Sequence, residues 1–168
     1  MSSVRIFNDY LPGDVFDNLQ NVMMSSDFPW HWTSNISTCP DTNNQDGQFQ
    51  FLHPFLIPET GLVSPYMQLL WPLVNKIYPA HILRIKANLN VNNSGKQLGY
   101  FHVDQFVKES KTAIFYVNTN DGYTEFDTGE TVNSIANRLV VFDSDTKHVG
   151  YGSTECERRV LINLNYVL

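Results

Sequence analysis

The chain has 168 residues, of which 42% are hydrophobic and 13% aromatic, and its formal net charge at pH 7 is −6. This length and composition predict a single folded domain with a sizeable core and exclude a disordered chain. The acidic balance argues against a general nucleic-acid binder, which needs a cationic surface, so no nucleic-acid partner is expected.

The cysteines and the apolar stretches indicate the compartment. Two cysteines, Cys39 and Cys156, are too few to suggest a disulfide framework. The N-terminal residues lack the apolar core of a signal peptide, and every apolar stretch is shorter than the roughly 20 residues that cross a membrane. We therefore expect a cytoplasmic protein with reduced thiols and no membrane partner.

The first half of the chain predicts helices around a loop. Apolar residues recur at helical spacing over residues 12–26 and again over residues 65–77. Pro72 should interrupt the second helix, because proline removes a backbone hydrogen bond. Residues 33–47 are rich in turn-forming residues and are expected to form a loop. With Trp30 and Trp32, this loop is a candidate lid or substrate wall, although a buried aromatic cluster is an equal alternative.

The second half of the chain predicts short strands separated by turns, a pattern typical of an antiparallel sandwich or barrel. The expected strands of the whole chain span residues 4–7, 49–57, 82–91, 97–103, 112–117, 122–126, 131–135, 138–142, 147–151 and 158–167. We therefore expect one domain over residues 1–168, with a mainly helical N-terminal support (1–80) and a β-barrel core (81–168).

A candidate metal site lies in the barrel half. His102 and Asp104 are two residues apart, and residues i and i+2 of a strand point to the same face. Two imidazoles and one carboxylate form the facial triad of non-haem Fe(II) oxygenases, which leaves coordination positions for a cosubstrate and O2. His148, 44 residues after Asp104, is the expected third ligand.

The other histidines fit a metal site less well. His31, His53 and His81 each lack a carboxylate two residues away. We expect structural or surface roles for all three, and His31 could also line a substrate pocket.

The last predicted strand carries the candidate cosubstrate residue. Alternation places Arg158 on its more uniformly apolar face, which predicts Arg158 inside the barrel and Arg159 outside. A buried arginine needs an anionic partner, and the distal carboxylate of 2-oxoglutarate would supply one through paired hydrogen bonds. An inward Tyr116 either donates to the same carboxylate or has its hydroxyl satisfied in the core. Tyr100, which shares a face with His102, is a further candidate for the pocket wall.

The order of these motifs from His81 to Tyr166 resembles the prolyl-hydroxylase-like branch of the 2-oxoglutarate/Fe(II) oxygenases. The motifs are Phe101-His102-Val103-Asp104, Ala113-Ile114-Phe115-Tyr116-Val117-Asn118, Gly122-Tyr123-Thr124-Glu125-Phe126, Asn137-Arg138-Leu139-Val140-Val141-Phe142, His148 and Arg158. Many relatives carry Gly-Gly-x-Thr where this chain has Tyr123 as the second residue. The short, Asn-rich chain is similar to small bacteriophage and marine bacterial members.

The resemblance implies a mainly β fold, a double-stranded β-helix (jelly roll) with flanking N-terminal helices. It implies Fe(II) held by His102, Asp104 and His148, with Arg158 and Tyr116 on 2-oxoglutarate. O2 is the oxidant, and ascorbate is an additional candidate cofactor. The implied activity is hydroxylation of a peptidyl prolyl or other residue, or of a small molecule, with release of succinate and CO2. A non-catalytic jelly-roll binding module and a cupin-like metalloenzyme without 2-oxoglutarate are the alternatives.

Overall fold

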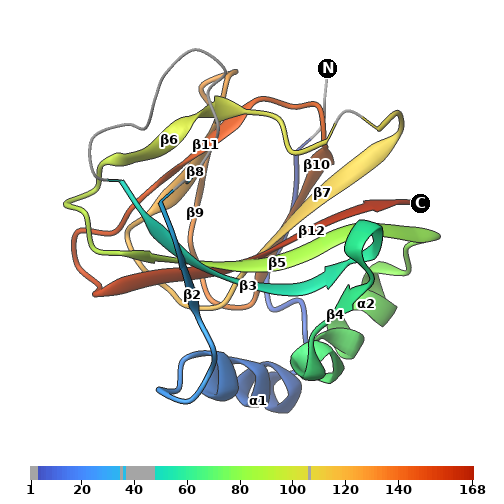
Figure 1. The fold of residues 1–168 in the computed structure, drawn as a ribbon. Helices are drawn as coiled ribbons and strands as arrows, with labels where there is room; N and C mark the ends of the chain where they lie inside the picture. Colours follow the sequence, from blue (N-terminus) through green and yellow to red (C-terminus); the bar gives the residue numbers. More distant parts are fainter. Residues whose placement is uncertain (1–3, 35, 37–47, 106) are drawn as a thin grey trace.

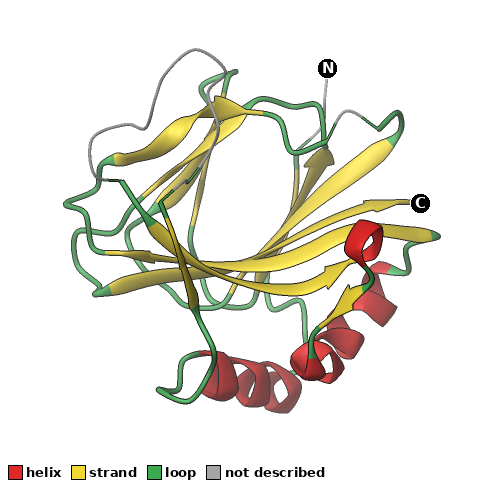
Figure 2. Cartoon of the chain, viewed as in Figure 1, coloured by secondary structure: helices red, strands yellow, loops and turns green. Residues whose placement is uncertain are grey.

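The computed structural model describes residues 4–34, 36, 48–105 and 107–168. Most of the expected loop over residues 33–47, with the lid predicted there and Cys39, lies outside the described residues. Two β-sheets face each other, and helices lie on the outer side of the larger sheet (Figures 1 and 2). The chain is therefore mainly β and has a jelly-roll fold, as the sequence predicts.

All strand pairs among the described residues are antiparallel, and the strands divide into a large and a small sheet. The large sheet runs in the order β1-β10-β7-β12-β5-β3-β2, with β4 paired to β3, and the small sheet runs β6-β11-β8-β9. The large-sheet strands are β1 (Arg5–Phe7), β2 (His31–Thr33), β3 (Gln50–Ile57), β4 (Leu62–Val63), β5 (His81–Val91), β7 (Ser110–Tyr116), β10 (Arg138–Asp143) and β12 (Arg158–Val167). The small-sheet strands are β6 (Gln97–His102), β8 (Tyr123–Phe126), β9 (Thr131–Asn133) and β11 (His148–Tyr151).

The helices are α1 (Gly13–Met23) and α2 (Trp71–Ile77), with 3₁₀ turns η1 (Pro58–Thr60) and η2 (Pro65–Leu70). The second predicted helix is interrupted as expected: η2 gives way to α2, whose first turn contains Pro72. The left-handed conformation of Tyr78 (φ 56°) then ends α2.

Along β5 and β12, the outer face of the large sheet is apolar and the inner face is mostly polar. Val160, Ile162 and Leu164 of β12 belong to one apolar core together with residues of α1 and α2. The alternate β12 residues Arg159 and Asn163 line the space between the sheets instead. The prediction that the more uniformly apolar face of β12 lines the barrel interior is therefore wrong, because the helices cover that face. A second, smaller core fills one end of the barrel and includes Tyr116, Phe126, Val140 and Phe142.

The N-terminal part contributes strands as well as helices. β3 pairs with β5 along the large sheet, and β1 pairs with β10 at the opposite edge. β2 and β4 have three and two residues, too few for an alternation pattern to show. No helix among the described residues is long and apolar enough to cross a membrane.

Candidate active site

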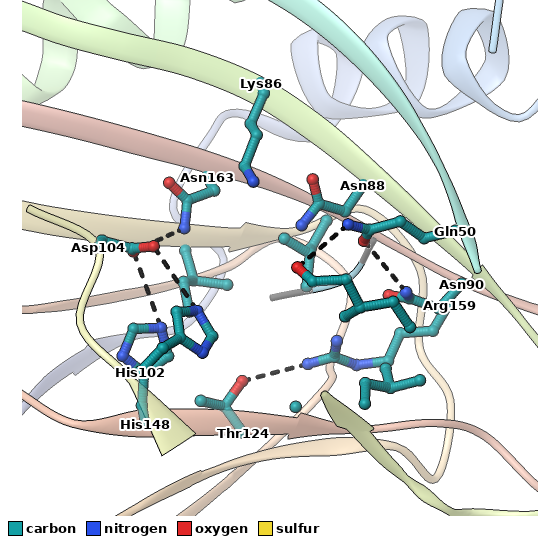
Figure 3. Close-up of a pocket in the computed structure, with 15 residues that line it drawn as sticks. Gln50, Lys86, Asn88, Asn90, His102, Asp104, Thr124, His148, Arg159 and Asn163 are labelled. Atoms are coloured by element: carbon teal, nitrogen blue, oxygen red, sulfur yellow. Dashed lines mark hydrogen bonds and ion pairs between the residues drawn. The ribbon is translucent and has the colours of Figure 1, made fainter. Parts of the chain in front are cut away.

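The three predicted metal ligands meet between the two sheets. His102 ends β6, Asp104 follows in the next loop, and His148 begins β11 directly opposite His102 in the register. One potential ligand atom from each of the three side chains lies within 4.8 Å of the others. The Nε2 atoms of His102 and His148 lie 3.9 and 3.7 Å from the carboxylate oxygens of Asp104 (Figure 3).

The two imidazoles turn the same ring nitrogen, Nε2, toward the carboxylate of Asp104. The Nδ1 of His102 lies 2.8 Å from the carbonyl oxygen of Tyr100, and the Nδ1 of His148 lies 3.0 Å from that of Thr146. A carbonyl only accepts, so each Nδ1 carries the hydrogen and a neutral ring leaves its lone pair on Nε2. Burial and the neighbouring His148 lower the pKa of His102, which favours the neutral ring that a metal requires.

Asp104 is held as a buried carboxylate, with its side chain 5% exposed. The side-chain amides of Asn163 and Asn165 donate to its Oδ2 at 2.8 and 3.4 Å, and Arg84 lies 3.7 Å from Oδ1. Burial alone would raise the pKa of Asp104, but His148, the Asn163 hydrogen bond and His102 outweigh it and bring the pKa to about 2. The third ligand is therefore ionised at neutral pH.

Arg159 occupies the opposite wall of the same pocket and is 2% exposed. Its Nε donates to the Ser134 hydroxyl at 2.8 Å and one terminal nitrogen donates to the Thr124 hydroxyl at 3.1 Å, while the Tyr116 ring lies 5.5 Å from the guanidinium carbon. Among the described residues, no carboxylate lies within ion-pair distance of Arg159. A buried cation without a protein counter-ion indicates a site for an anion.

Arg158, the arginine chosen from the sequence, does not reach this pocket. It is half-buried on the helical side, where its guanidinium donates to the carbonyl oxygen of Met24 at 2.8 Å. The placement of Arg158 inside and Arg159 outside is therefore reversed in the structure.

Neither tyrosine candidate lines the described part of the pocket. Tyr116 points inward as predicted, but it is fully buried and its hydroxyl is 2.8 Å from the Thr124 hydroxyl, beside Arg159. Tyr100 contributes its carbonyl to the orientation of His102. The side chains of Tyr100 and Tyr116 are not among the described residues that line the pocket.

The remaining histidines lie away from the triad. His53 is buried, with Nδ1 2.8 Å from the Pro29 carbonyl oxygen and Nε2 2.8 Å from the Ser64 hydroxyl. His31 stacks near His53 at 6.2 Å, and His81 begins β5. None of the three lines the described part of the pocket.

Polar residues of the inner sheet face complete the pocket, and sequence analysis missed their role. They are Gln50 of β3, Lys86, Asn88 and Asn90 of β5, and Asn163 of β12. A sequence signal existed: Arg84, Lys86, Asn88 and Asn90 occupy every second position of β5. A polar stripe on a strand whose other face is apolar predicts either a solvent face or a polar cavity, and only the second sheet decides between them.

Comparisons with known proteins support the fold. No family model matches the chain, and no curated protein matches it in sequence. A 2OG-Fe(II) oxygenase family oxidoreductase from Burkholderia pseudomallei matches with a TM-score of 0.66 at 11% identity, over 98% of this chain and 84% of that one. A Trichoplax adhaerens prolyl hydroxylase in complex with a hypoxia inducible factor peptide fragment matches with a TM-score of 0.63 at 14% identity, over 98% and 83%. The epimerase SnoN in complex with Fe3+, alpha ketoglutarate and nogalamycin RO matches with a TM-score of 0.61 at 12% identity, over 98% and 78%. The resemblance to the 2-oxoglutarate/Fe(II) oxygenases is thereby confirmed at the level of the fold.

Proposed function

We propose that this chain is an Fe(II)- and 2-oxoglutarate-dependent dioxygenase that hydroxylates its substrate. The observation that carries the proposal is a single pocket. His102, Asp104 and His148 form a triad on one wall of it, and the buried Arg159 lies on another. The first fits a divalent metal with open positions, and the second fits the distal carboxylate of a dicarboxylate cosubstrate. One solved structure of the same fold, that of the epimerase SnoN with Fe3+ and alpha ketoglutarate bound, adds support.

His102, Asp104 and His148 would hold the metal. Bound Fe(II) supplies the redox chemistry that couples decarboxylation of 2-oxoglutarate to insertion of one oxygen atom into a substrate C–H bond. In balance, substrate, 2-oxoglutarate and O2 give the alcohol, succinate and CO2. The second oxygen atom of O2 enters succinate, so no external reductant is needed for a coupled turnover.

The residues around the metal position have orienting roles. The carbonyls of Tyr100 and Thr146 fix the two rings, and Asn163 fixes the carboxylate of Asp104. Arg159 would bind the far carboxylate of 2-oxoglutarate, and Ser134 and Thr124 aim its guanidinium by accepting from it. Tyr116 supports Thr124 and Arg159 from behind, which replaces the direct contact expected from the sequence.

The buried arginine also separates this function from the alternatives. A cupin-like metalloenzyme that does not use 2-oxoglutarate has no need of an unpaired guanidinium in the metal pocket. A non-catalytic module has no need of two rings that are both fixed with Nε2 toward one carboxylate.

The test is formation of succinate from 2-oxoglutarate under Fe(II) and O2, with and without ascorbate, in the absence of any other substrate. We expect the wild type to form succinate and Asp104→Ala to form none above the protein-free background. Asp143→Ala removes a carboxylate that pairs with Lys111 outside the pocket, and it should retain the wild-type rate. Equal rates for the wild type and Asp104→Ala would refute the proposal.

A further inference from the structure

Lys86 places a second cationic side chain in the pocket, at the level of the metal ligands. It lies on the inner face of β5 and pairs in register with Asn163, the residue that donates to Asp104. Its ammonium group projects into the pocket beside Asn163 (Figure 3). No carboxylate of the described residues lies within 4.0 Å of it. Burial and the nearby Arg84 lower the pKa of Lys86 to about 8, so the group is still mostly charged at neutral pH.

Lys86 is separated from the site assigned to the cosubstrate carboxylate. Arg159 pairs with Asn90, and Asn163 pairs with Lys86, four residues further along both strands. At about 3.3 Å per residue, the two backbone positions are about 13 Å apart. The two cations therefore serve different levels of the pocket.

The charges of the proposed holoenzyme leave a place for one more anion. Fe(II), Arg159 and Lys86 bring four positive charges, whereas Asp104 and the two carboxylates of 2-oxoglutarate bring three negative charges. Arg84, which is 28% exposed beside Asp104, adds a further positive charge. Charges in a partly desolvated pocket need counter-charges, so the excess favours an anionic substrate.

Two side-chain amide oxygens near Lys86 lack a hydrogen-bond donor among the described residues. The Oδ1 atoms of Asn88 and Asn163 are buried and have no hydrogen-bond partner among the described residues. Asn88 is two residues from Lys86 on the same face of β5, and Asn163 is its cross-strand neighbour. Buried polar atoms are nearly always paired in native proteins, so a ligand with an N–H or O–H group would complete them.

We propose that Lys86 binds the carboxylate of the substrate, and that the substrate is a small amino or hydroxy acid. The carboxylate satisfies the ammonium, and the amino or hydroxyl group donates to Asn88 or Asn163. Lys86 is then a specificity-determining residue of the reaction; that the bound acid is oxidised rests on the proposed function.

Binding is tested without turnover, on protein loaded with redox-inert Zn(II) and saturated with 2-oxoglutarate. The probes are the standard L-amino acids and the matching L-2-hydroxy acids, each titrated calorimetrically alongside its primary amide. We expect at least one acid to bind the wild type about tenfold more tightly than its amide. Lys86→Met should abolish that preference and leave the affinity for 2-oxoglutarate within about threefold. Lys111→Met removes a lysine that pairs with Asp143 outside the pocket, and it should keep the preference.

Two outcomes would overturn the proposal. One is that no acid binds the wild type more tightly than its amide, or that Lys86→Met keeps the preference. The other is that Lys86→Met weakens 2-oxoglutarate binding about tenfold or more, which assigns Lys86 to the cosubstrate. Succinate formation separates this hypothesis from the proposed function. Its absence in the wild type refutes only the dioxygenase function, whereas the titrations test only the binding of an acid by Lys86.

Discussion

Arg158 and Arg159 are adjacent residues that end in different layers of the molecule. Arg159 is buried in the pocket, where two hydroxyl groups accept from it, and Arg158 reaches a carbonyl oxygen of the helical layer. They therefore form a matched pair for mutation, with the same side chain, the same strand and different surroundings.

Arg159→Met should weaken 2-oxoglutarate binding by about 2 kcal/mol or more, or at least about 30-fold, because the distal carboxylate would be buried without its partner. Arg158→Met should leave this affinity within about threefold and reduce the free energy of unfolding by about 1 kcal/mol through the lost hydrogen bond. Titration of the Zn(II)-loaded variants with 2-oxoglutarate measures both affinities, and denaturant unfolding measures the free energy of unfolding. The reverse ranking would return the cosubstrate role to Arg158.

Asp104 and His102 also predict how stability depends on pH in the metal-free protein. The pKa of Asp104 falls from 3.8 in the unfolded chain to about 2 in the fold, so its ionised form stabilises the native state above about pH 4. That contribution, on the order of 2 kcal/mol, is lost as the pH falls toward 2. The lowered pKa of His102 acts in the same direction, with stability lost as the pH falls below the ordinary value of 6.5.

Denaturant unfolding of the metal-free protein between about pH 5 and pH 2 measures this loss. Asp104→Asn should show a smaller loss over this range than the wild type. A curve for Asp104→Asn that parallels the wild type would show that Asp104 is not stabilised as a carboxylate in the fold.

Both helices and the longer strands could be predicted because each has a period that the sequence displays, whereas β2 and β4 are too short to show one. The i, i+2 spacing also identified His102 and Asp104, although β6 ends at His102 and Asp104 lies in the loop that follows it. The sequence could not show which face of β12 lines the barrel interior, because both faces are buried. One face packs under helices and the other lines a polar pocket, so the rule that the apolar face points inward selects the wrong layer. Lys86 could not be placed for a different reason, since the polar stripe of β5 fits a solvent face as well as a polar cavity.

Gly122, which precedes β8, shows how closely this element approaches β12. A Cβ atom at Gly122 would lie 2.7 Å from the Tyr151 carbonyl oxygen and 2.8 Å from Cδ of Arg159. Gly122→Ala should therefore reduce the free energy of unfolding by about 1–3 kcal/mol and weaken 2-oxoglutarate binding by displacing Arg159. Gly13→Ala in α1 is the control, because no atom lies within 4 Å of its added Cβ. Thermal unfolding and the same titration report both effects, and a neutral Gly122→Ala would contradict the close packing of β8 on Arg159.

The three proposed metal ligands connect the two sheets of the molecule. His102 and His148 belong to the small sheet, whereas Asp104 receives hydrogen bonds from Asn163 and Asn165 of the large sheet. Further links run from Arg159 and Tyr116 of the large sheet to the hydroxyl group of Thr124 in the small sheet. One pocket between the sheets is therefore lined by both the proposed metal ligands and Arg159, and binding there should resist separation of the sheets.

A bound divalent metal should accordingly raise the stability of the whole domain. At a free concentration about 100 times its Kd, a ligand that binds only the native state adds about 2.7 kcal/mol. For a domain of this size, that corresponds to a rise in Tm of about 5–10 °C. Anaerobic thermal unfolding with Fe(II), Mn(II) or Zn(II), each reversed by a chelator, measures the shift. His148→Ala should abolish it, and His81→Ala, at the start of β5 and outside the triad, should keep it. His148 lies on β11 of the small sheet, and Asp104 is hydrogen-bonded to Asn163 on β12 of the large sheet. A Tm shift of the same size in His148→Ala would therefore mean that the ion binds elsewhere and does not connect the two sheets.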